Sequence, residues 1–244
     1  MTSLSNPVAT ASKDEDIAAA RTSRTQDPVG VKRNILEVAK EEFAAKGFSG
    51  ARVDEIAART RTSKRMLYYY FGDKERLYMA VLEAVYLTIR TEESALDLDR
   101  LEPEQALATL TAFTFDHQNA NSEFVRIVMN ENILGATFLK RSAIVRDACA
   151  RAIDDITRIV SRGQHAGAFR KPLDPVDLHM TISALSFFNV ANQATFSAVF
   201  GVDMTSPAAL ALRRAQVVEA VLRYARRDGA RSPRACGGVA ILTK

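Results

Sequence analysis

Residues 62–78 read TSKRMLYYYFGDKERLY and hold, in one row, three of the six tyrosines of the chain. Ser63 is a typical N-cap residue, so the pattern predicts a short helix that begins there, runs to about Tyr70 and ends at Gly72. Each residue of an α-helix is rotated by about 100° from the one before it. Three consecutive tyrosines therefore point in three directions, and we expect them to have three different roles.

A helical wheel separates a buried side of this helix from an exposed side. Leu67 and Phe71 fall together on the side that must face other helices. Beside them lies an outward arc with two cations and two tyrosines, which we call the exposed arc: Lys64, Arg65, Tyr68 and Tyr69. We expect Tyr69 to point most nearly away from the core and Tyr68 to lie at its edge. Tyr70 falls on the other flank of the buried side, where packing and a phosphate contact compete.

The exposed arc has the chemistry of a DNA-binding surface. Cations pair with phosphates, arginine can also bind a guanine edge, and tyrosine offers a hydroxyl to phosphate and a flat ring to thymine methyl groups. Residues 59–74 hold five cations and one acid, Asp73. Lys74 stands at the start of the next helix, where backbone N–H groups can hold a phosphate. The alternative interpretation is a short amphipathic helix whose exposed side is basic and aromatic but binds nothing.

Two further helices precede this one. Asp27-Pro28 reads as an N-cap followed by proline at the first helical position, and apolar residues at helical spacing continue to a stop at Gly47. A second, short helix fits residues 53–60. Two short helices joined by a tight turn and braced by a third form the helix-turn-helix plan. We therefore predict a DNA-binding domain over residues 27–73, preceded by a mobile extension over residues 1–26.

Residues 35–82 resemble the DNA-binding domain of TetR/AcrR-family transcriptional regulators. The resemblance rests on motif residues at the family's spacing: Phe43, Gly47, Phe48, Ile56, Ala57, Ser63, Lys64, Leu67, Tyr68, Tyr69, Phe71, Lys74, Glu75 and Leu77. It implies an all-α homodimer whose third helices enter successive major grooves of a palindromic operator. The positions that match DNA contacts of the family are Arg52, Thr62, Ser63, Lys64, Arg65, Tyr68, Tyr69, Tyr70 and Lys74.

The chain departs from the family pattern at four of its motif positions. Arg61 replaces the common turn glycine, so we expect local strain or a left-handed residue other than glycine there. Arg65 replaces a frequent small glycine, which adds a base or phosphate contact. Tyr70 replaces a common histidine, and Arg52 replaces a phosphate-binding threonine. These departures leave the operator sequence unreadable from the protein sequence.

The rest of the chain reads as helices separated by Gly- and Pro-containing loops. A long helix follows Asp73, and further helices are predicted over residues 103–118, 122–138, 142–164, 174–199 and 207–227. No alternating β-branched pattern predicts a strand. The fold class is therefore all-α. The resemblance implies that residues 74–227 form an effector-binding and dimerisation domain, and we expect residues 228–244 to be a flexible tail.

Polar residues among aromatic ones predict a ligand pocket in this second domain, because such pockets are apolar with a few converging polar groups. The predicted lining is Phe124, Ile127, Val128, Asn130, Leu134, Phe187, Phe188 and Asn189. Small residues over positions 184–198, with the helix that follows Ser206, also suit close helix packing between subunits. The predicted dimer interface is Ala184, Ala191, Ala194, Ala198, Val217 and Val221. The two interpretations compete for residues 184–198, where the interface is favoured.

The sequence contains no motif typical of an enzyme, a metal-binding protein, or a secreted or membrane protein. The three histidines are scattered, no phosphate loop or nucleophile motif is present, and the two cysteines match no metal spacing, so we expect no enzyme, metal or cofactor. No signal sequence or apolar run of eighteen residues occurs, which predicts a cytoplasmic protein without a membrane partner.

The function predicted from these patterns is that of a repressor. We expect it to leave a palindromic operator when a small-molecule effector binds. Its expected partners are double-stranded DNA, a second copy of the chain and that effector. The alternative function is a helical ligand-binding or protein-interaction module that does not bind DNA specifically.

Overall fold

The structure is a computed structural model that describes residues 27–227, so the predicted N-terminal extension and C-terminal tail lie outside the described residues. The helices are α2 (Pro28–Gly50), α3 (Val53–Arg59), α4 (Lys64–Phe71), α5 (Lys74–Ser94), α6 (Pro103–Ala120), α7 (Ser122–Ile133), α8 (Ala143–His165), α9 (Pro175–Ala191), α10 (Gln193–Phe200) and α11 (Pro207–Ala225), with 3₁₀ turns η1 (Leu98–Arg100) and η2 (Leu139–Arg141). Between residues 27 and 227 the single β feature is an isolated bridge from Phe169 to Arg226. The all-α prediction is confirmed.

The helices begin where the sequence supplies a cap. The side chains of Asp27, Ser63 and Asp73 accept hydrogen bonds from backbone N–H groups in the first turns of α2, α4 and α5. Proline stands in the first turn of α2, α6, α9 and α11, where no intrahelical N–H is required. Local sequence thus fixes the start of α4 and the residues that it exposes.

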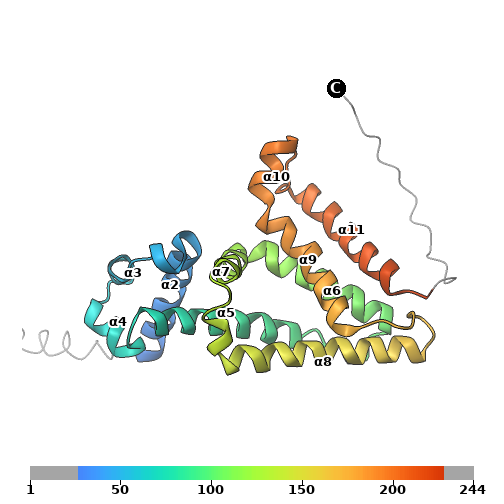
Figure 1. The fold of residues 1–244 in the computed structure, drawn as a ribbon, viewed down its shortest axis with the longest axis horizontal. Helices are drawn as coiled ribbons and strands as arrows, with labels where there is room; N and C mark the ends of the chain where they lie inside the picture. Colours follow the sequence, from blue (N-terminus) through green and yellow to red (C-terminus); the bar gives the residue numbers. More distant parts are fainter. Residues whose placement is uncertain (1–26, 228–244) are drawn as a thin grey trace, which may run out of the picture.

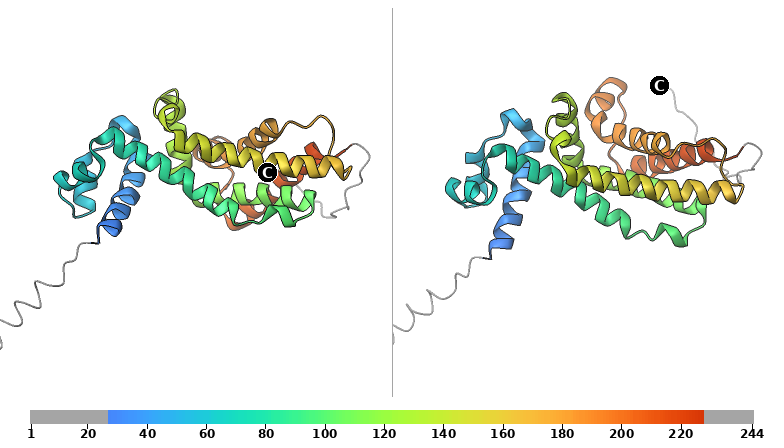
Figure 2. Two further views of the ribbon diagram at one scale, coloured as in Figure 1. Left: turned by 90° about the horizontal axis from the view of Figure 1, so that it is seen from below. Right: turned by 60° about the horizontal axis from the view of Figure 1, so that its bottom comes forward.

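Helices α2, α3 and α4, which hold the predicted DNA-binding domain, form one end of the molecule, called the DNA-binding end below. Helix α5 leads from them into the second domain (Figure 1). There α8 packs along α5, while α6, α9 and α11 pack on one another farther from the DNA-binding end (Figures 1 and 2). Helix α7 lies between the two parts and packs against α2. The DNA-binding end is therefore supported by two elements of the second domain, α5 and α7.

The core of the DNA-binding end continues into the second domain. Tyr78 of α5 packs edge-on against Phe43 of α2, with ring centroids 4.8 Å apart. Phe138, which follows α7, lies 4.9 Å from Tyr78 and 4.6 Å from Phe48, again between ring centroids. These rings belong to one buried cluster together with Ile127 of α7. The predicted domain boundary at residue 73 lies in the turn between α4 and α5. One hydrophobic core runs across this boundary.

Two predicted helices are shorter than the sequence suggested. The helix predicted over residues 122–138 ends at Ile133, because Gly135 and Ala136 have positive φ values of 66° and 58°. The helix predicted over residues 174–199 is interrupted at Asn192, which has φ −107° and ψ 6°. Both predictions were wrong in extent, because an apolar pattern continues across a break that the backbone makes at one or two residues.

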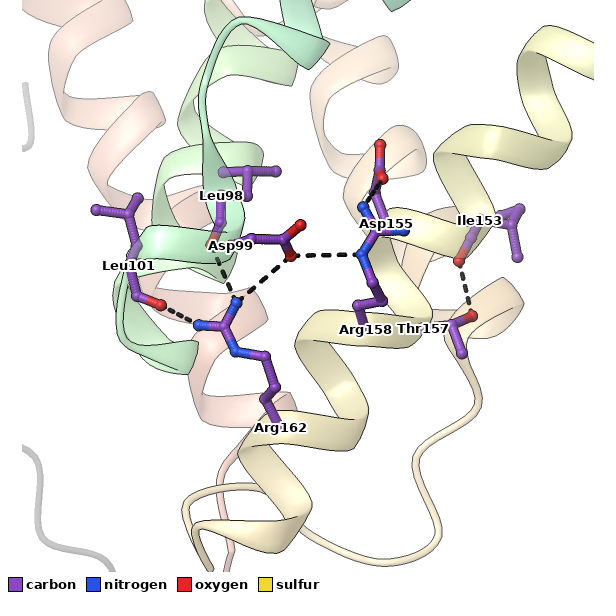
Figure 3. Close-up of polar contacts among 8 residues, drawn as sticks. All are labelled: Leu98, Asp99, Leu101, Ile153, Asp155, Thr157, Arg158 and Arg162. Atoms are coloured by element: carbon purple, nitrogen blue, oxygen red, sulfur yellow. Dashed lines mark hydrogen bonds and ion pairs between the residues drawn. The ribbon is translucent and has the colours of Figure 1, made fainter.

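The loop after α5 is held to α8 by two arginines (Figure 3). Arg162 donates to the backbone oxygens of Leu98 and Leu101. Asp99 lies between Arg162 and Arg158, with N–O distances of 3.6 and 3.3 Å. These contacts fix the end of α5 that lies away from the DNA-binding helices.

None of the helices in residues 27–227 combines the length and apolar character that crossing a membrane requires.

Candidate nucleic-acid interface

The turn between α3 and α4 is built from side-chain and backbone hydrogen bonds. Thr60 donates from Oγ1 to the backbone oxygen of Ile56 at 2.8 Å, and the Thr62 N–H donates to Ala57 O at 3.0 Å. Arg61 between them has φ 52°, so the predicted left-handed residue other than glycine is confirmed. Ser63 then accepts from Met66 N at 3.2 Å and starts α4. The turn thereby sets the angle at which α4 leaves α3.

Helix α4 exposes the side chains that the wheel placed outside. Leu67 and Phe71 are buried in the core, whereas Tyr69 is 77% exposed and Tyr68 is 43% exposed. Tyr70 is half-buried, and its ring meets the Tyr69 ring edge-on with centroids 5.4 Å apart. The expected division of the three tyrosines into exposed, edge and partly packed positions is confirmed. Contact of any of them with DNA stays a prediction.

The cations of this surface are less free than the sequence count suggested. Lys64 pairs with Asp54 of α3 at 2.9 Å, and Arg59 pairs with Glu41 of α2. The hydrogen bond and charge of Lys64 lower the pKa of Asp54, and those of Asp54 raise the pKa of Lys64. Counting charges over residues 59–74 overlooked these acids because they come from neighbouring helices. Among the contacts of residues 27–227, none engages the guanidinium groups of Arg61 or Arg65.

Lys74 is bent back towards its own domain. Its ammonium lies 3.4 Å from the backbone oxygen of Ser49 and 5.0 Å from the centre of the Phe48 ring. Burial lowers the pKa of this lysine. A contact with phosphate from this position requires the side chain to leave Phe48.

Arg52 occupies the N-cap position of α3, and its side chain is exposed. Its backbone N–H donates to Oε1 of the buried Glu42 at 3.1 Å, which ties α3 to α2. Burial acts to raise the pKa of Glu42, but hydrogen bonds from Lys46 and from the Arg52 N–H outweigh it, so the net shift is downward. Glu42 therefore holds an ionised acceptor under the start of α3, and α3 in turn supports α4.

Sequence reasoning missed three residues of this surface. Asp54 and Glu42 position or neutralise its cations, and Lys32 of α2 lies with its ammonium 5.6 Å from the centre of the Phe71 ring. The role of Asp54 could have been inferred from the sequence. An acid in the first turn of a helix is typical, and in a helix-turn-helix the next helix, which carries Lys64, begins close by. Lys32 had no such signal, since it lies on α2 and only the tertiary fold brings it beside Phe71 of α4.

The predicted effector residues do not gather around one cavity. Phe124 and Ile127 are buried in the core, and Val128, Leu134 and Phe187 pack against it. Asn189 donates to Asn119 Oδ1 at 2.8 Å, and Asn130 donates to the backbone oxygen of Phe43 at 3.3 Å. Phe188 is 44% exposed. The two asparagines thus hold helices together, and the ligand contacts of this set stay a prediction.

The predicted interface residues fall into two groups. Ala184, Ala194 and Ala198 are exposed, and Ala191 is half-buried. Val217 and Val221 are buried within the protomer, because α11 packs against α6 along this stripe. We correct the prediction for these two valines, which present no side-chain surface to a second copy. Leu212 of α11 is 54% exposed and lies on the opposite side of that helix.

Comparison with known proteins places these features in a family. The model of bacterial regulatory proteins of the tetR family matches residues 35–81, and a tetracyclin repressor-like C-terminal domain matches residues 103–221. The HTH-type transcriptional repressor NicS of Pseudomonas putida is 33% identical over 211 residues, which cover 86% of this chain and 97% of that protein. The chain belongs to the TetR family of transcriptional regulators.

Solved structures of TetR-family proteins share the fold of this regulator. A bacterial regulatory protein of the family from Rhodococcus RHA1 superposes with a TM-score of 0.66 at 23% identity, covering 80% of this chain and 97% of that one. FadR from Bacillus subtilis, in complex with stearoyl-CoA, gives a TM-score of 0.58 at 16% identity, covering 79% and 98%. The family model over residues 35–81, from within α2 to the first half of α5, together with the match to NicS, makes this chain a DNA-binding regulator. Residues 27–227 contain no cluster of histidine, cysteine and acidic side chains suited to a metal ion.

Proposed function

We propose that this regulator is a repressor that binds a palindromic operator as a homodimer and leaves it when a small molecule binds. The observation that carries the proposal is the exposed arc of α4, where Tyr69 is 77% exposed beside two cations. A large ring held mostly in solvent on a short, well-capped helix contributes little to the hydrophobic core. Its position suits the major groove, which is wide enough to admit a helix.

The proposed DNA contacts divide into two kinds. Arg65 and the ring of Tyr69 would read base edges, because they project from the outer side of α4. Phosphate contacts would come from the edge of the surface: Arg52, Thr62, Ser63, Lys64, Tyr68, Tyr70 and Lys74. Phosphate contacts position the protein and base contacts specify the sequence. Arg65→Ala should therefore relax sequence preference, whereas Lys74→Ala should weaken binding to every sequence about equally.

A homodimer is proposed through the exposed side of α9 and α11. These helices pack against each other and expose apolar side chains that serve no protomer core: Val176, Met180, Phe188 and Leu212, which are 56%, 62%, 44% and 54% exposed. Large apolar side chains exposed on a monomer in such number are typical of an interaction site. Two such helix pairs would form a four-helix interface. Leu212→Glu should then give a monomer in sedimentation velocity, and Ile133→Glu, at an 81% exposed position on α7, should not.

Release by a small molecule is supported by family membership and by the FadR structure, which holds stearoyl-CoA in the same fold. Effector and operator binding are linked reciprocally, so a molecule that weakens DNA binding must bind the DNA complex more weakly to the same degree.

The experiment that tests DNA recognition is selection from a random duplex library by the purified full-length protein. We expect enriched sequences to contain two inverted half-sites about one helical turn apart. Arg65→Ala should broaden the base preference within each half-site while keeping their spacing. Absence of any enriched sequence at low salt would overturn the proposal and favour a helical interaction module.

A further inference from the structure

A cavity of about 100 Å³ lies where the DNA-binding end meets the second domain. We call it the junction cavity. Its apolar wall comes from Leu36 of α2, Val81 and Val85 of α5, and Phe124 of α7. Residues of α2 and of the second domain therefore face the same space, so the contents of the cavity affect how the two parts pack.

The side-chain donors around the junction cavity are already engaged. Lys40 pairs with Glu37 at 2.5 Å, and the Thr88 hydroxyl donates to Ala84 O at 2.9 Å. The Asn121 amide donates to His117 O at 2.9 Å. A molecule in the cavity therefore meets few free donors.

In contrast, several hydrogen-bond acceptors around the junction cavity make no polar contact with other residues in positions 27–227. His117 Nδ1 lies 2.9 Å from Glu92 Oε2 and 3.4 Å from Asn121 Nδ2; in the neutral tautomer that donates to the nearer Glu92, Nε2 is an acceptor. Within residues 27–227, no polar contact engages His117 Nε2, Asn121 Oδ1 or the carboxylate of Glu123. All three residues line the cavity. Its polar side is thus an acceptor-rich wall with one unpaired negative charge.

We propose that the junction cavity binds a small amphipathic amine, with an apolar body about the size of one aromatic ring against Leu36, Val81, Val85 and Phe124. The ammonium group would donate to Glu123 and to the acceptors of His117 and Asn121. An anion of the same size is disfavoured, because the lining carries two carboxylates, Glu37 and Glu123, against one cation, Lys40, which already pairs with Glu37. The cavity, at about 100 Å³, is smaller than the cavity of about 150 Å³ that holds benzene, so a ring of this size fits only when the helices around it move apart.

The position of the cavity gives the amine a route to the DNA-binding helices. Helix α2 packs along α7, and two points of this contact matter here: Asn130 bonds to Phe43 in the second half of α2, and Leu36 and Phe124 face the cavity one to two turns earlier. A ligand at the second place would push α2 away from α7 while the first place holds. Since α2 carries α3 and α4, we infer that the amine weakens operator binding, which rests on the proposed repressor function.

The test is isothermal titration of the full-length protein with benzylamine, benzyl alcohol and benzoate at pH 7.4. We expect benzylamine to bind at least tenfold more tightly than benzoate, with benzyl alcohol between them. Glu123→Gln should remove most of the preference for benzylamine over benzyl alcohol, whereas Glu102→Gln, an exposed acid outside the cavity, should not. Ala84→Leu should abolish binding by filling the space, and Ala45→Leu, at an exposed position on α2, should leave it unchanged.

Nuclear magnetic resonance of the histidine side chains tests binding in the unmodified protein. Its result does not depend on whether the variants fold correctly. The chain has three histidines, so the imidazole nitrogens can be assigned with His165→Gln and His179→Gln. Benzylamine should shift the His117 signals and leave those of His165 in place. Equal binding of benzoate, unmoved His117 signals, or no amine binding at all would overturn the assignment of the cavity.

The two proposals fail separately. If benzylamine binds as described but the affinity for the selected operator is unchanged, the route to α4 is wrong while the site stands. If the protein selects no DNA sequence, the repressor function is wrong, and the titration still decides the site.

Discussion

Asn130 Nδ2 lies 3.3 Å from the backbone oxygen of Phe43, so a side chain of α7 holds the carbonyl of a residue 87 positions earlier in α2. Asn130→Ala leaves the Phe43 oxygen without this donor and should lower the free energy of unfolding by about 1–3 kcal/mol. Urea denaturation followed by circular dichroism measures the change. Asn132→Ala, at an exposed position of the same helix, is the control and should change stability little. Equal stability of both variants would contradict a role for this bond.

Gly47 lies beside the same asparagine. It has φ 66°, and a Cβ added there would lie 3.2 Å from Asn130 Oδ1. Gly47→Ala should destabilise the fold by about 1–2 kcal/mol, because a left-handed conformation is costly for any residue with a Cβ. Adding Asn130→Ala should remove the close contact but keep the backbone cost, so the double variant should lose less than the sum of the two single changes. Gly50→Ala is the control, since only Lys46 Cβ comes near it, at 3.4 Å.

The ion pair between Lys64 and Asp54 competes with DNA for the lysine. Asp54→Asn should free Lys64 and remove a negative charge from the surface, so affinity for the selected operator should rise about two- to tenfold at low salt. Fluorescence anisotropy at several salt concentrations measures it. Asp97→Asn makes the same charge change in the loop after α5 and should have a much smaller effect. If both variants bind alike, Lys64 does not contact DNA.

Leu67 and Lys64 show which features of α4 could be predicted from the sequence and which could not. Helical period and caps placed Leu67 inside and Tyr69 outside correctly, because both follow from local geometry within α4. The pairing of Lys64 with Asp54 depends on where the start of α3 lies in space relative to α4, which no local pattern specifies. The same limit applies to α11, where the apolar stripe of Val217 and Val221 was identified but its partner was not. The stripe packs on α6 of the same protomer instead of a second copy.

The phenol of Tyr86 on α5 makes the stability of the second domain sensitive to alkali. Burial raises its pKa to about 12, with a further contribution from Cys149. A raised pKa means that the contribution of this group to stability is complete below pH 10 and is lost as the pH rises from 10 to 12.

Tyr86→Phe should therefore lose less stability than the unmodified protein over this pH range. At pH 7 the substitution should be nearly neutral, because no hydrogen bond from a group in residues 27–227 contributes to the raised pKa of this hydroxyl. Thermal unfolding midpoints measured from pH 7 to 12 give the comparison. Tyr69→Phe, at the exposed position on α4, should leave the alkaline slope unchanged. Parallel curves for all three proteins would contradict the role of Tyr86.

The ring of Phe138 reaches into the DNA-binding end, where it packs on Tyr78 and Phe48. The segment that resembles a DNA-binding domain therefore does not have a hydrophobic core of its own, because its core includes residues of the second domain. Moving residues 27–94 onto another effector-binding domain would leave Phe43, Phe48 and Tyr78 without the rings and methyl groups that cover them. We therefore expect that DNA sequence specificity can be exchanged between such regulators more easily by replacing single side chains of α4 than by transferring the whole DNA-binding end.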